Sequence, residues 1–272
     1  MPILSTSETE LYYEVTGQGP PVLLIQGVGA AGEAWRPQVN ELSSSFTTLL
    51  FDNRGLGRSS KCHGPITIEA MADDARQLLG TVGWDSAHVM GHSMGGVIAQ
   101  QLALNDPARV RSLSLLCTFA RAKLAARLTP WVLWMTLRTR LGTRQSRRRA
   151  FLEMLFPADH LQGANLDHLA QQVANWIGRD LAEHPPILMK QLRALARHDT
   201  SSRLGELARI PTLVISAEHD RIALPPYGQA IAERIPGAQF ELWRGASHGV
   251  IIQEATRLNQ RLKTFLDRVE KS

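Results

Sequence analysis

The strongest constraint on the fold of this chain is an alternation of short apolar runs with helical patterns over its first 117 residues. The apolar runs are continuous, which is typical of strands that are buried on both faces. Strands that alternate with helices predict right-handed crossovers and a mostly parallel sheet. The apolar runs span residues 21–26, 47–52, 87–91 and 110–117, the helical windows span 67–79 and 96–105, and 11–15 alternates like a half-exposed strand.

The alternation stops at Thr118, and only helical patterns follow until about Ser202. Thr129-Pro130 and Ser146 are the expected starts of two of these helices. Strand patterns resume at 210–216 and 239–243, before a last amphipathic helix. We therefore expect an α/β fold in which helices flank a mostly parallel sheet of about eight strands, with a helical cap inserted after strand six. Residues 1–118 and 203–272 would form the core, and residues 119–202 the cap.

Gly91-His-Ser-Met-Gly95 matches the pattern G-x-S-x-G, which is weak by itself. Here the pattern follows an expected strand and precedes an expected helix, as a nucleophile elbow requires. Ser93 is therefore the candidate nucleophile. The alternative is a tight turn between strand and helix in which the serine is incidental.

A serine nucleophile needs a base, and the base needs a carboxylate to orient it. His248 stands in the Gly- and Ser-rich segment 245–249 after the last expected strand, at the edge where active sites of parallel sheets assemble. Asp220 directly follows the strand at 210–216, with Glu218 as its nearest competitor. We expect His92 to point away from Ser93.

Taken together, these segments resemble the α/β-hydrolase superfamily, in its lidded serine esterase and lactonase branch. The resemblance covers nearly the whole chain and includes the family's order of Ser, Asp and His. It implies catalytic residues Ser93, Asp220 and His248, and an oxyanion hole formed by the backbone amides of Val28 and Met94. The motifs that carry it are Gln26-Gly27, Phe51-Asp-Asn-Arg-Gly-Leu-Gly-Arg-Ser59, Gly91-His-Ser-Met-Gly-Gly96, Glu218-His-Asp220 and Ser247-His-Gly249.

The chain departs from the family at one position, because Gln26 stands where His is usual before the glycine. Backbone amides form the oxyanion hole, so this glutamine need not abolish it. Asp52 and Arg54 look structural in this family, tying loops together through hydrogen bonds.

The function we expect is hydrolysis of carboxylic esters, lactones or thioesters through an acyl-enzyme on Ser93, without a metal or organic cofactor. Two alternatives stay open: a hydrolase-like protein that only binds a ligand, and an acyltransferase or cofactor-free perhydrolase that uses the same site. The substrate is expected to be a small molecule, hydrophobic or anionic.

The charge of the chain is concentrated in one segment. The formal net charge is +5, but residues 121–150 hold nine Lys and Arg and no acid, which leaves −4 for the rest. This segment could attract an anionic substrate or touch a membrane surface, and a solvated helix face is the simpler interpretation. No motif supports nucleic-acid binding.

With two cysteines, no signal segment and no long apolar run, we expect a cytoplasmic protein.

Overall fold

The computed structural model describes residues 2–59, 61–121 and 130–272, and its centre is a sheet of eight strands in the order β1-β2-β4-β3-β5-β6-β7-β8. Strands β3 to β8 are parallel, and β2 and β1 extend the sheet antiparallel at one edge. The expected mostly parallel α/β sheet is confirmed. The strands are β1 (Ile3–Ser5), β2 (Glu10–Thr16), β3 (Pro21–Ile25), β4 (Thr47–Phe51), β5 (Ala87–His92), β6 (Val110–Leu116), β7 (Thr212–Ala217) and β8 (Gln239–Trp243).

Helices cover both faces of the sheet because successive side chains of each strand point to opposite faces. In β3, Leu23 and Ile25 join the apolar cluster under one set of helices, whereas Val22 and Leu24 join the cluster under the other. The first set is α2 (Ile68–Thr81), α3 (Met94–Asn105) and α10 (Pro225–Arg234), and the second is α1 (Arg36–Leu42), α11 (Val250–Gln253) and α12 (Ala255–Glu270). Short 3₁₀ helices are η1 (Gly32–Trp35), η2 (Gly57–Ser59), η3 (Pro107–Arg109) and η4 (Leu204–Leu207).

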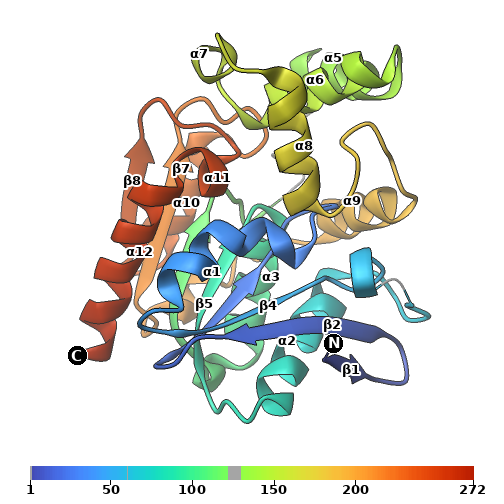
Figure 1. Ribbon diagram of the computed structural model, residues 1–272. Coiled ribbons are helices and arrows are strands. Elements are labelled where there is room, and N and C mark those ends of the chain that lie inside the picture. The colour runs from blue at the N-terminus through green and yellow to red at the C-terminus, as the bar shows by residue number, and fades with distance from the viewer. Residues whose placement is uncertain (1, 60, 122–129) are drawn as a thin grey trace.

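Between β6 and β7 the described residues form only helices, which we call the inserted helices. Figure 1 shows α5–α8 beyond the end of the sheet to which the β7 and β8 arrows point. Their own apolar cluster includes Leu152, Val173 and Ile177, and Ala30 of the sheet core packs against it. The inserted helices are α5 (Pro130–Arg140), α6 (Arg144–Leu155), α7 (Ala158–Leu161), α8 (Leu166–Ile177) and α9 (Ile187–Arg197).

Two details of these helices bear on the sequence predictions. Helix α6 begins two residues before Ser146, and Thr143 is its N-cap, with its side chain accepting from the Ser146 amide. The prediction that Ser146 caps this helix is therefore wrong; both residue types can cap, and the backbone is extended at Thr143. Thr129, the other expected cap, lies outside the described residues.

Within the described residues, no helix is both long enough and apolar enough to cross a bilayer.

Candidate active site

The turn after β5 holds Ser93 in a conformation that side chains seldom adopt. Ser93 has φ of 55° and ψ of −120°, and among the described residues only Cys117 is another non-glycine with positive φ. The Ser93 amide donates to the Leu116 carbonyl at 3.0 Å, and its carbonyl accepts from the Thr118 hydroxyl at 2.6 Å. The strained turn is thus held by hydrogen bonds to β6 and to the residues just after it.

The glycines around Ser93 are required because backbone atoms of neighbouring segments lie where a Cβ would be. A Cβ on Gly95 would overlap the carbonyl oxygen of Ile25 at the end of β3, and one on Gly91 would overlap the Gly95 carbonyl. The sharp turn therefore packs directly on the backbone of the neighbouring strand, with the N-terminus of α3 behind Ser93.

Ser93, His248 and Asp220 lie in one hydrogen-bonded line. His248 Nε2 is 3.1 Å from Ser93 Oγ, and His248 Nδ1 is 2.7 Å from Asp220 Oδ2. All three residues are buried. A carboxylate can only accept, so Nδ1 carries the proton and Nε2 offers its lone pair to the serine hydroxyl. This is the arrangement that a serine nucleophile and its base need.

Asp220 is fixed on its other oxygen, where Oδ1 accepts from the amides of Ile222 and Ala223, each at 2.8 Å. The competitor Glu218 is exposed and accepts from the Gly245 amide at 3.0 Å. Three sequence-predicted residues on separate loops are thus brought together, and Glu218 is not among them.

The two candidate oxyanion donors flank the serine. Met94 is the first residue of α3, and Val28 lies in the loop 26–29 after β3. This loop touches the nucleophile, since a Cβ on Gly27 would lie 3.0 Å from Ser93 Cβ. Among the described residues, no hydrogen bond occupies the amide of Val28 or of Met94. Neither amide is therefore taken by another acceptor among these residues, as donors of an oxyanion hole require.

His92 is a site residue whose role the sequence did not indicate. Its ring is buried, with Nδ1 3.0 Å from Gln26 Oε1 and Nε2 2.8 Å from the carbonyl oxygen of His248. Burial lowers the pKa of His92 to about 3, and the neighbouring His248 acts in the same direction. A neutral ring has one N–H, so it donates to one of the two oxygens at a time. His92 thus lies between the loop after β3 and the loop that carries His248, and it donates to one of them at a time.

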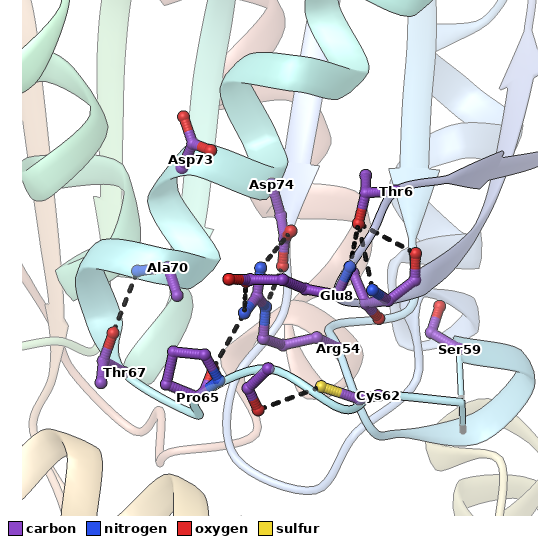
Figure 2. Close-up of polar contacts among 12 residues, drawn as sticks. Thr6, Glu8, Arg54, Ser59, Cys62, Pro65, Thr67, Ala70, Asp73 and Asp74 are labelled. Carbon is purple, nitrogen blue, oxygen red and sulfur yellow. Dashed lines mark hydrogen bonds and ion pairs between the residues drawn. The ribbon is translucent and has the colours of Figure 1, made fainter.

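The motif residues Asp52 and Arg54 tie loops together. Figure 2 shows Arg54 reaching the carboxylate of Asp74, at 2.6 and 2.7 Å, and also Glu8 and the Pro65 carbonyl. Asp52 accepts from the amide of Gly32 at 2.8 Å. Neither residue makes a hydrogen bond to Ser93, His248 or Asp220, so their contacts agree with the structural role that we expected.

A cavity of about 370 Å³ adjoins the loops that carry Asp220 and His248. Its walls come from these loops and from the inserted helices, and they combine aromatic and aliphatic side chains with charged ones. The lining residues are Trp131, Glu153, Met154, Phe156, Pro157, Ala158, Asp159, Leu161, His219, Arg221 and Ser247.

Comparison with known families agrees with this geometry. Residues 20–255 match the family described as "alpha/beta hydrolase fold". The chain belongs to this family. Among curated α/β-hydrolase relatives, two proteins named "Putative carbamate hydrolase RutD" are similar over nearly their full lengths. The one from Azorhizobium caulinodans is 30% identical (99% of this chain, 100% of that protein), and the one from Caulobacter sp. strain K31 is 31% identical (94% and 95%).

Solved α/β-hydrolase structures of similar shape include two enzymes. The enol-lactonase from Burkholderia xenovorans LB400 has a TM-score of 0.81 and 27% identity, covering 98% of this chain and 100% of that one. A thermophilic esterase from Thermogutta terrifontis has a TM-score of 0.80 and 27% identity, covering 99% of both chains. Together with the family match, these likenesses establish the chain as a hydrolase.

Proposed function

We propose that this hydrolase cleaves small carboxylic esters, lactones or thioesters through an acyl-enzyme on Ser93. The observation that carries the proposal is the hydrogen-bonded line from Ser93 Oγ through His248 to Asp220, beside two unoccupied backbone amides. A ligand-binding protein that kept these three residues would have the same geometry, and fast labelling of Ser93 by a fluorophosphonate separates the two alternatives.

In the proposed reaction, His248 Nε2 removes the proton from Ser93 as Oγ attacks the carbonyl carbon. The amides of Val28 and Met94 hold the oxyanion of the tetrahedral intermediate. His248 then gives the proton to the departing alkoxide or thiolate, and the acyl group stays on Oγ. Water then attacks the acyl-enzyme as His248 takes one of its protons, and His248 returns this proton to Ser93 Oγ as the bond to the acyl group breaks and the acid leaves. Asp220 keeps His248 in the productive tautomer and stabilises the imidazolium.

We further propose that residues 119–202 act as a helical cap on a core made of residues 1–118 and 203–272. The cavity beside the Asp220 and His248 loops supports this division, since both parts line it. Its aromatic and aliphatic walls would suit a hydrophobic group of the substrate.

We also propose that the protein acts in the cytoplasm, because its two cysteines are unpaired in the structure, as is usual in a reducing compartment.

A second candidate activity is carbamate hydrolysis, which the names of the two curated relatives favour. The same attack by Ser93 on a carbamate carbonyl would either expel the alcohol and leave a carbamoyl-enzyme, or expel the amine and leave an alkoxycarbonyl-enzyme, with His248 giving the proton to the leaving group. Parallel assays with an ester and with a carbamate that shares its alcohol decide between the two activities.

The proposal is tested by Ser93→Ala, with Ser114→Ala as a matched control because Ser114 is a buried serine on the neighbouring strand β6. We expect Ser93→Ala to reduce kcat on a p-nitrophenyl ester by about 10⁴-fold or more, with folding unchanged. Ser114→Ala should stay within a few-fold of the parent. Turnover by Ser93→Ala at the parental rate would refute the assignment.

A further inference from the structure

The oxyanion loop 26–29 is held by the inserted helices as well as by the core. The Gly29 amide donates to Gln191 Oε1 of α9 at 2.9 Å, and the Gly29 carbonyl accepts from Arg179 Nε at 3.1 Å. Both backbone groups of Gly29 are therefore satisfied by side chains that lie about 150 residues further along the chain. Gly29 has φ of +66°, and a Cβ there would overlap Leu188 of α9, so the contact is close.

This contact bears directly on the amide of Val28. The Val28 N–H belongs to the peptide group between Gly27 and Val28. The peptide group before it is held because the Gly27 amide donates to Gln26 Oε1 at 2.6 Å. The peptide group after it is held by Gln191. The peptide group that carries the Val28 N–H is itself held through its carbonyl, because the Gly27 carbonyl accepts from the Ala30 amide at 3.5 Å. The bond to Gln191 anchors Gly29 inside the turn that this contact closes, and so limits rotation of the Val28 N–H.

Gln191 is fully buried, and the bond to Gly29 is the one hydrogen bond that its side chain makes among the described residues. Its Nε2 has no partner there, which costs stability. An aliphatic side chain would fill the same space without an orphaned donor. We therefore attribute the side-chain amide of Gln191 to its hydrogen bond with the loop and not to the packing of α9.

From this geometry we propose that Gln191 is a positioning residue for the oxyanion hole, acting through the Gly29 amide on the Val28 N–H. The proposal rests on the proposed function, since it concerns the oxyanion of the Ser93 reaction. It makes α9 a support of the catalytic apparatus, although no residue of this helix lines the cavity beside the Asp220 and His248 loops.

The test uses Gln191→Met, which keeps the length of the side chain but cannot accept from Gly29. We expect kcat on a p-nitrophenyl ester to fall about 10- to 100-fold with KM within about threefold, because the bond matters most when the oxyanion forms. The inhibition constant of a trifluoromethyl ketone, which forms a tetrahedral adduct on the serine, should rise by a similar factor.

Two further variants separate positioning from loss of structure. Gln191→Glu keeps an acceptor at the same reach and should recover kcat to within about fivefold of the parent. Leu192→Gln changes an exposed neighbour on the same helix and should leave kcat unchanged. If Gln191→Met fails to fold, Gln191→Asn, which is one methylene too short to reach Gly29, provides the same measurement.

The outcomes distinguish this inference from the proposed function. If Ser93→Ala abolishes turnover while Gln191→Met and Gln191→Asn keep the parental kcat and inhibition constant, the role of Gln191 is wrong and the serine mechanism stands. If Ser93→Ala remains active, the proposed function itself is wrong.

Discussion

At the scale of single residues, the site depends on contacts between polar groups that lie far apart along the chain. His92 lies one position before the nucleophile, yet its ring spans the space between Gln26 and the carbonyl of His248. A buried neutral imidazole of this kind packs between two loops and donates to one of them at a time. It also makes the stability of the fold depend on pH.

The depressed pKa of His92 predicts the sign of that dependence. A folded value of about 3 lies below the ordinary value of about 6.5, so between these pH values the unfolded chain binds a proton that the folded chain does not. The contribution to stability is full above about pH 6.5 and is lost as the pH falls toward 3, by up to about 1.4 kcal/mol per pH unit.

Urea unfolding between pH 7 and pH 4 should therefore show a smaller loss of unfolding free energy in His92→Asn than in the parent. Other titrating groups are common to both proteins, so the difference between the two slopes isolates His92. Identical slopes in the two proteins would contradict the buried neutral imidazole.

At the scale of elements, the nucleophile elbow requires β3, β5 and α3 to pack so closely that only glycine, which has no Cβ, fits between their backbones. A Cβ on Gly95 would overlap the Ile25 carbonyl, which cannot move without disturbing the pairing of β3. Gly80, near the end of α2, has nothing within 4 Å of its Cβ position.

We therefore expect Gly95→Ala to lower the unfolding free energy by about 2 kcal/mol or more and to reduce ester turnover with it. Gly80→Ala should raise the unfolding free energy by up to about 1 kcal/mol and leave turnover unchanged, because alanine favours a helix over glycine. Thermal or urea unfolding of both variants checks the pair. Equal tolerance at the two positions would refute the close approach at the elbow.

The elements that could be predicted from sequence are those with strong local patterns. The parallel strands β3, β4, β5 and β7 are apolar runs that are mostly buried on both faces, so their positions follow from the sequence, whereas β8 at the edge mixes polar with apolar residues and is half-exposed. Strand β1 was missed because it has only three residues and is largely exposed. Ser93, Asp220 and His248 could be proposed as site residues because each follows an expected strand, β5, β7 or β8. Gln191 could not, since its contact with Gly29 arises only when α9 packs on the core, and no local pattern marks it.

At the scale of the whole molecule, the strongly cationic segment is partly neutralised by acids outside it. Asp180 bonds to Arg144 and Arg148, and Glu153 bonds to Arg138 and Arg149. The hydrogen bond from Arg148 is the largest influence that holds the pKa of Asp180 below its ordinary range. The interpretation of these arginines as a solvated helix face is thus incomplete, because ion pairs join α6 to the segments around it.

Arginine still dominates one surface hollow. A cavity of about 680 Å³ is lined by Arg140, Arg144 and Arg147 together with Ala182, Glu183 and His184. The pKa of His184 lies below its ordinary value, first through burial and then through the charges of Arg179 and Arg140. The inserted helices therefore carry much of the positive charge of the chain, whereas the proposed catalytic residues follow strands β5, β7 and β8.

The central claim is that His248 activates Ser93 as a nucleophile, and covalent labelling tests it most directly. A fluorophosphonate reacts when Oγ bonds to phosphorus and fluoride leaves, so only an activated serine is labelled quickly. Peptide mass spectrometry should place the adduct on Ser93, with labelling abolished in Ser93→Ala and strongly slowed in His248→Ala. An ester-hydrolysing protein in which Ser93 stays unlabelled, or is labelled as fast without His248, would contradict the account.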